Sequence, residues 1–285
     1  MTTTQPWHTA RTPFAILAAP PMLWLLVFFL APLAIIWAYS FGENTSLTDI
    51  SINGTFANYA RATNPLYLAI IAKSLWFAAL TTLACLIIGF PVAVAITFAQ
   101  PRTKVWLLLL VMLPFWTNLL IRTYALMAVL RTEGYINTAI GWIGLGPLDL
   151  LHNNFAVVFG LVYVQLPFMV LPLYAALDRL DRSLIEASLD LGAGHLSTFA
   201  RIVVPLSLPG IVSGIIVTFI PSLGAYLTPE LLGGTNSQMI ANIIERQFKS
   251  ANDWPFGAAL SFLLMYMTFA AIAFQSMLAK RRATP

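Results

Sequence analysis

The side chains that most often do chemistry in proteins are few in this chain and lie apart. Cys85 is the one cysteine, so neither an intrachain disulfide nor a cysteine metal site is available. The three histidines, His8, His152 and His195, fall outside the long apolar stretches, and no His-Glu-x-x-His spacing occurs. No serine has an evident base to activate it. The sequence therefore predicts no catalytic site and no metal site, which argues against an intramembrane enzyme.

The segment from residue 178 to 205 has an ordered pattern of its own. Ser183 and Glu186 have the spacing of a capping box, which predicts a helix that begins near Leu184. One face of this helix should carry small or apolar side chains, namely Leu184, Ala187, Ser188 and Leu191. Gly192 can then end the helix, because glycine adopts a positive φ without steric strain.

A second short helix is expected from His195 to Val203. Pro205 should stop it, because proline has no amide hydrogen to donate. The product would be two helices joined by a tight turn on the membrane surface, a shape that suits a docking element for another protein. The alternative is an amphipathic connector that rests on lipid headgroups.

The rest of the chain indicates what this segment is attached to. Hydrophobic residues make up 59% and charged residues 9% of the 285 positions, so a water-soluble fold could not cover its apolar surface. Six stretches approach the roughly 20 apolar residues that cross a bilayer. They are residues 14 to 41, 74 to 99, 105 to 129, 155 to 177, 206 to 227 and 257 to 279. We therefore expect an all-α integral membrane protein with about six transmembrane helices, forming a single domain over residues 1–285.

Basic residues favour one orientation of these helices. With a cytoplasmic N-terminus, the inside segments 1 to 13, 100 to 104, 178 to 205 and 280 to 285 hold nine lysines and arginines, whereas the longer outside segments hold five. The positive-inside rule therefore predicts that both termini are cytoplasmic. The same bias accounts for the modest net charge of +4, and nothing indicates nucleic-acid binding.

Small residues and prolines predict how some helices are shaped. Prolines inside the apolar stretches, Pro114 among them, should kink their helices. Gly210 and Gly214 lie one helical turn apart and permit close contact with a neighbouring helix. Pro221 and Gly224 then predict a break at the end of the same stretch.

The 178 to 205 segment also resembles a family motif. Glu186-Ala187-Ser188, Gly192 after three residues, Ile202 after nine more, and Val204-Pro205 after one more follow the EAA loop of ABC importer permeases. Ser188 and Val204 replace the second alanine and the leucine of that pattern. Four further stretches are similar to spermidine/putrescine permeases. They are Asn58-Tyr59 with Pro65-Leu66-Tyr67, Pro114 to Arg122, Leu161 to Tyr174, and Asp253 to Gly257.

This resemblance implies a type I ABC importer permease-like fold whose cytoplasmic coupling helix fits an ATP-binding subunit. The coupling residues that it implies are Glu186, Ala187, Ser188, Leu191, Gly192 and Pro205. It also implies a second related permease, two ATP-binding cassette subunits and an extracytoplasmic solute-binding protein, assembled in the bacterial inner membrane and working by alternating access. The chain has no Gly-x-x-x-x-Gly-Lys-Ser/Thr loop, so ATP and magnesium should be held by partner subunits, with no cofactor on this chain.

A cationic substrate such as a polyamine would need carboxylates and aromatic faces along its path. The candidates are Tyr226 and Glu230 after the fifth apolar stretch, Asp253 and Trp254 before the sixth, and Tyr163 and Gln165 within the fourth. Simple solvation is the alternative for the two carboxylates. For Tyr163 and Gln165 the alternative is an interhelical hydrogen bond.

Two polar residues interrupt the third apolar stretch, Asn118 and Arg122. An arginine would repel a polycation, so we expect a gate or a structural contact there, or snorkelling to the interface. For the whole chain, a secondary carrier is disfavoured because no acidic residue falls in the centre of a predicted helix. An ABC permease for another small solute stays open as the main alternative.

Overall fold

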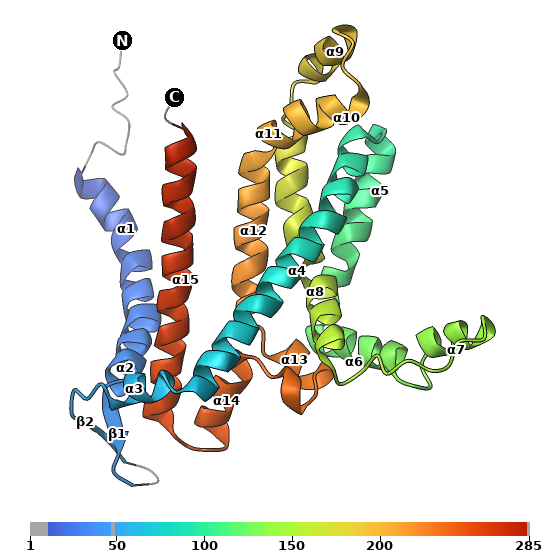
Figure 1. Cartoon of the computed structure of the whole chain (residues 1–285). Coiled ribbons are helices and arrows are strands. Elements are labelled where there is room, and N and C mark those ends of the chain that lie inside the picture. Colours follow the sequence, from blue (N-terminus) through green and yellow to red (C-terminus); the bar gives the residue numbers. More distant parts are fainter. Residues whose placement is uncertain (1–10, 47–48, 284–285) are drawn as a thin grey trace. The chain divides into compact units, whose positions relative to one another are not determined.

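The computed structural model describes residues 11–46 and 49–283, and these are mostly helical (Figure 1). They form two compact units. The first contains the described residues up to Asn64 together with those from Ile244 onward, and the second runs from Pro65 to Ile243. Residues 1–10 and 284–285, which belong to the predicted inside segments, lie outside the described residues. The expectation of one domain stays a prediction.

The first unit combines long helices with a small hairpin. Its elements are α1 (Arg11–Leu25), η2 (Leu26–Leu30), α2 (Ala31–Tyr39), β1 (Gly42–Asn44), β2 (Ile50–Ile52), α3 (Ala57–Ala62), part of α14 (Ile240–Lys249) and α15 (Trp254–Ala283). The hairpin strands pair antiparallel, with Gly42 opposite Ile52. α2 packs against α15, where the Trp37 indole donates a hydrogen bond of 2.9 Å to the Tyr266 hydroxyl.

The second unit holds the remaining elements. They are α4 (Pro65–Phe98), α5 (Pro101–Met112), η3 (Leu113–Trp116), α6 (Leu119–Leu130), α7 (Tyr135–Trp142), α8 (Asn154–Leu177), α9 (Arg182–Asp190), α10 (His195–Thr198), η4 (Phe199–Val203), α11 (Val204–Leu206), α12 (Leu208–Leu223), α13 (Leu227–Leu232), η5 (Thr235–Ser237) and the start of α14. Its centre is formed by α4, α8 and α12, which pack against one another. Buried Cys85, Met169 and Leu173 belong to this core.

Glycines let the central helices approach closely, as predicted for Gly210 and Gly214. A Cβ on Gly210 would lie 2.4 Å from the Ala176 Cβ, and one on Gly214 would lie 2.7 Å from the Met169 sulfur. Both distances are too short for a side chain, so α12 presses its backbone against α8. The predicted break also occurs, since α12 ends at Leu223.

The predicted spans and the observed helices agree in part. In the part of the chain that the structure describes, three helices are long and apolar enough to cross a membrane by themselves, over Ala15–Tyr39, Pro65–Phe98 and Asn154–Leu177. Two further pairs are bent, by 96° between Pro101–Trp116 and Leu119–Trp142 and by 64° at Ser207. The expectation of one helix over 105 to 129 was therefore wrong. Up to five spans result if each bent pair counts as one, so the count of six stays a prediction for the described residues.

The second unit has two distinct ends. Figure 1 shows the turn between α4 and α5 together with α9 and α10 at one end, and α6, α7 and α13 at the other. The predicted inside segments 100 to 104 and 178 to 205 thus lie at the same end of this unit. Which end faces the cytoplasm stays a prediction.

Candidate functional site

The helix predicted within the 178 to 205 segment is present as α9, but its cap is not the predicted one. The Asp181 carboxylate accepts a hydrogen bond of 3.0 Å from the Ser183 amide, so α9 begins at Arg182. The capping box of Ser183 and Glu186 was therefore wrong. A carboxylate suits a helix start better than a hydroxyl, because it also complements the positive end of the helix dipole. The backbone hydrogen bond from Ser183 lowers the pKa of Asp181.

α9 turns two different faces to its surroundings. Ser188 points inward, where its hydroxyl lies 2.9 Å from the Thr198 hydroxyl of α10. Leu184, Ala187 and Leu191 are exposed, and Leu191 is 88% exposed. Ser188 differs from the other three residues of the expected face because it is half-buried. Glu186 is also exposed, so α9 offers one carboxylate beside a short apolar strip.

The turn after α9 follows the prediction for Gly192. This glycine has a φ of +82°. Its amide donates to the Leu189 carbonyl at 2.9 Å, and the Ala193 amide donates to the Ser188 carbonyl at 3.1 Å. The two bonds form a Schellman motif, which satisfies carbonyls that the helix end would otherwise leave unpaired. The turn is therefore a rigid connection.

Pro205 does not stop the second helix, contrary to expectation. The helix continues to Leu206, and the bend of 64° follows at Ser207. Residues Phe199–Val203 widen into a π-helical turn just before the proline. Such a turn separates the proline ring from the carbonyl four residues earlier, which the ring would otherwise meet. The same arrangement occurs in the first unit, where η2 precedes Pro32.

The segment predicted as a coupling loop, residues 178–205 and called the coupling loop below, is tied to the end of the helix core. Asp178 pairs with Lys104 of α5, and that hydrogen bond lowers the pKa of Asp178. The Arg182 guanidinium donates to the Thr97 carbonyl at 3.3 Å and lies 5.5 Å from the Phe98 ring centre. Both ties reach the turn between α4 and α5. Sequence reasoning missed them because they join residues far apart in the chain.

Tyr226 and Glu230 lie together at the other end of the second unit. The buried Asn242 side chain donates to the Glu230 carboxylate at 2.7 Å and to the Tyr226 carbonyl at 3.1 Å. Glu230 itself is exposed in the first turn of α13. Asn242 was not predicted, although its place in the amphipathic helix α14 was a usable signal. The arrangement holds a carboxylate in a fixed position with one side open to the surroundings.

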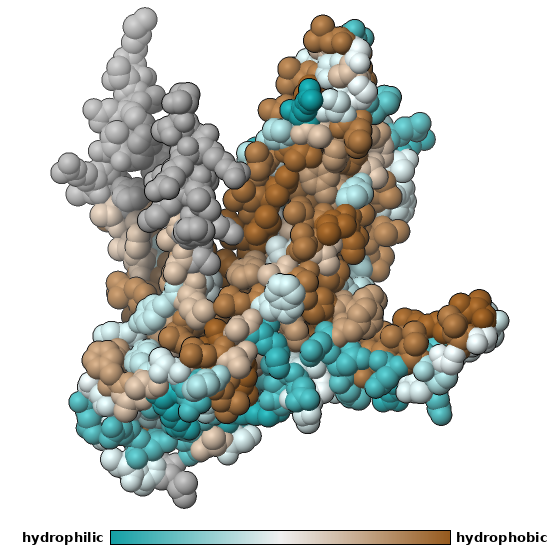
Figure 2. Space-filling view, viewed as in Figure 1, coloured by the Kyte–Doolittle hydropathy of each residue, from teal (hydrophilic) through white to brown (hydrophobic). Residues whose placement is uncertain are grey.

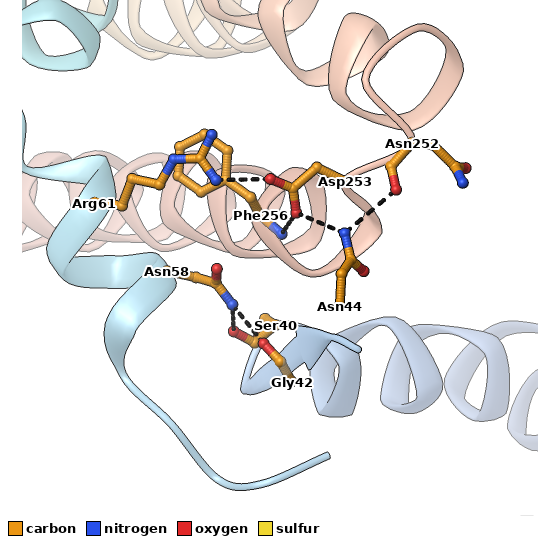
Figure 3. Close-up of polar contacts among 8 residues, drawn as sticks. All are labelled: Ser40, Gly42, Asn44, Asn58, Arg61, Asn252, Asp253 and Phe256. Carbon is orange, nitrogen blue, oxygen red and sulfur yellow. Dashed lines mark hydrogen bonds and ion pairs between the residues drawn. The ribbon is translucent and has the colours of Figure 1, made fainter. Parts of the chain in front are cut away.

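Asp253 is engaged by several groups of the first unit (Figure 3). The Arg61 guanidinium lies 2.6 Å from its carboxylate and 3.9 Å from the Phe256 ring centre. The carboxylate also accepts from the Phe256 amide at 3.3 Å and from the Asn44 side chain at 3.4 Å. Asp253 thus caps α15 and holds the hairpin to it. Trp254 beside it donates to the Asn252 side chain at 3.0 Å.

Tyr163 and Gln165 of α8 lie in different environments. Tyr163 is exposed, whereas Gln165 is buried in the helix core. Among the described residues no hydrogen-bond partner reaches the Gln165 Oε1 atom. The two residues therefore do not form one lining surface, and the interhelical hydrogen bond considered for Gln165 does not form at this oxygen.

Asn118 and Arg122 both lie at the bend of 96°. The Asn118 side chain caps α6 by accepting from the Leu120 amide at 2.8 Å. The Arg122 guanidinium is buried and donates to the Thr117 carbonyl at 2.9 Å. These contacts hold the bend between η3 and α6.

Known proteins resemble this chain in sequence and in fold. Residues 65–284 match the model of a family described as the inner membrane component of binding-protein-dependent transport systems. The spermidine/putrescine permease PotB of Escherichia coli (strain K12) is 41% identical over 243 residues, or 85% of this chain and 88% of that protein. PotB of Haemophilus influenzae is 39% identical over 84% of each chain. A bacterial ABC transporter for alginate import matches in structure with a TM-score of 0.78, at 17% identity over 98% of this chain and 99% of that one.

Proposed function

The chain belongs to the family of binding-protein-dependent transport system inner membrane components, and on that basis we propose that it carries polyamines across the inner membrane. As a member of this family it is a membrane permease subunit of an ABC importer. The observation that carries the choice of substrate is the 41% identity, over most of both chains, to a spermidine/putrescine permease. The structural likeness to an alginate importer supports the fold alone, because identity there is 17%.

The chemistry of the second unit supports a cationic substrate. Glu230 is exposed and its position is fixed by the buried Asn242. An ammonium group that approaches it would gain a charge-assisted hydrogen bond, and the nearby Tyr226 adds an aromatic ring. Asp253 is less suited to this role, because Arg61 already neutralises its carboxylate. We therefore assign Glu230 as the first substrate contact among the candidates.

The coupling loop is the proposed contact with an ATP-binding subunit. Its exposed surface combines the apolar Leu191 and Leu196, at 88% and 81% exposure, with Ala187 and Glu186. Apolar side chains that are this exposed at the end of a helix unit are better covered by another protein than left in water. ATP and magnesium then belong to two partner subunits, and a second permease and an extracytoplasmic binding protein complete an assembly that works by alternating access.

The test is uptake of labelled spermidine by the assembled importer in proteoliposomes. Glu230→Gln keeps the acceptor for Asn242 but removes the charge, and should lower kcat/KM about tenfold or more, since a hydrogen bond to a charged group contributes about 1.5–3 kcal/mol. Glu133→Gln, a matched change at another exposed position, should leave uptake unchanged.

The outcomes separate the parts of the proposal. Wild-type uptake by the Glu230→Gln importer would remove Glu230 from the substrate path. The polyamine assignment would be overturned if the binding protein stimulated the importer's ATPase activity when loaded with another solute and never when loaded with spermidine or putrescine. The permease assignment would then stay intact.

A further inference from the structure

The bend at residues 113–122 turns the chain sideways from the helix core. The 12 residues of α5 and four of η3 rise together about 26 Å, close to the roughly 30 Å thickness of the hydrocarbon core. The pair α6 and α7 then departs at 96°. If α5 crosses the membrane, the arm formed by residues 119–148 must run along the membrane plane, near the surface opposite the coupling loop.

The far part of this arm is uncharged and strongly exposed. No charged residue occurs between Gly134 and Leu148. Trp142 is 86% exposed and Ile143 is 72% exposed. Figure 2 shows hydrophobic residues along the side of the arm that faces the coupling-loop end, and more hydrophilic residues along the other side. Such a division is typical of a helix that lies at a membrane surface.

Hydrogen bonds fix the shape of the arm. The Asn137 side chain donates to the Leu148 carbonyl at 2.9 Å and to the Arg131 carbonyl at 3.2 Å, and it accepts from the Leu148 amide at 2.8 Å. These three bonds close a loop around α7 and satisfy the amide of Asn137 on the buried side. Trp142 and Ile143 are thus exposed on a segment whose backbone is held in place by hydrogen bonds.

We propose that the arm is an interfacial anchor, with Trp142 and Ile143 inserted at the boundary between lipid headgroups and acyl chains in the leaflet opposite the coupling loop. Lipid is the expected neighbour of the arm, because the arm continues an apolar surface of the preceding helices. The apolar surface of α5 and η3, where Trp106, Leu110 and Trp116 are exposed, leads directly into the arm. Tryptophan and tyrosine are enriched at this depth of a bilayer, and Tyr135 is also exposed on the arm. The proposal depends on membership of the membrane family and not on the choice of substrate.

The test uses site-directed spin labels in the assembled importer in lipid nanodiscs. Cys85→Ala removes the native thiol, and single cysteines are then placed at Trp142, Ile143, Leu110 and Glu133. Leu110→Cys serves as the reference for the hydrocarbon core and Glu133→Cys as the reference for water. Collision rates with oxygen, which prefers lipid, and with a nickel chelate, which prefers water, give the depth of each label.

At Trp142→Cys and Ile143→Cys, oxygen should collide more often than the chelate, at a depth of about 5–10 Å below the headgroup boundary. Having two positions guards against a local effect of one substitution. Chelate access equal to that at Glu133→Cys would overturn the proposal, because Trp142 and Ile143 would then lie in water like the charged turn between α6 and α7. Protection from both reagents would overturn it as well, because the arm would then be covered by protein.

Discussion

Leu191 offers the sharpest test of the coupling loop. In the free chain its side chain is 88% exposed, so a partner that covers it would remove nearly all of its surface from water. Leu191→Ala deletes three carbon groups, and burial contributes about 0.8 kcal/mol per methylene. The expected loss is about 2 kcal/mol, which raises the Kd for the ATP-binding subunit about thirtyfold. Alanine can adopt the φ of −77° and ψ of 6° at this position, so the turn itself should survive.

The assay uses biolayer interferometry to measure equilibrium binding of the purified ATP-binding subunit to the permease in nanodiscs. Leu145→Ala is the matched control, because it removes the same atoms from an exposed leucine on the arm at the opposite end of the same unit. The control should bind with the wild-type Kd. A wild-type Kd for Leu191→Ala would refute the reasoning, because the exposed strip of α9 would then not be covered by this partner.

Three further changes test the structure itself. Gly192→Val should weaken the end of α9 by about 1–2 kcal/mol, because its φ of +82° is unfavourable for a side chain, whereas Gly192→Asn should be tolerated; amide exchange at Ala193 measures this. The pKa of Asp181 is lowered, so its stabilising contribution to α9 is complete above about pH 4 and is lost as pH falls through the lowered pKa. Amide exchange in α9, corrected for intrinsic rates, should therefore rise as the pH falls through this range. Gly210→Leu should lower the Tm through overpacking of about 1–3 kcal/mol, whereas Gly224→Ala, with its nearest atom at 3.9 Å, should not.

Each of these predictions has a result that contradicts it. Equal exchange in Gly192→Asn and Gly192→Val would show that the positive φ is not what matters. An exchange rate in α9 that does not change with acid would show that Asp181 is not the working cap. Equal Tm values for Gly210→Leu and the wild type would show that α12 can move away from α8 at little cost.

Local features of the fold were predictable from the sequence, because their causes lie within a few residues. Gly192 ends α9 as expected, since only its own backbone freedom is involved. The close packing at Gly210 and Gly214 also follows from the absence of their side chains. The choice between Asp181 and Ser183 as the cap was not predictable in the same way. Both residues carry a side chain that can cap a helix, and they lie only two positions apart in the chain.

The bend between η3 and α6 shows where hydropathy is uninformative. The mean hydropathy of residues 105 to 129 identifies an apolar stretch, but it does not show where the chain changes direction. The usable signal was Asn118 following Pro114, because a helix end and a new cap are then only a few residues apart. Hydropathy is equally uninformative at Pro205, because it does not show that the preceding backbone widens into a π-helical turn that accommodates the proline.

The two ties of the coupling loop have a mechanical consequence. Asp178 and Arg182 attach the loop to the turn between α4 and α5, while the chain itself connects it to α8 and α12. Under the proposed coupling, a push on this loop would therefore act on four helices at once and move them as one lever.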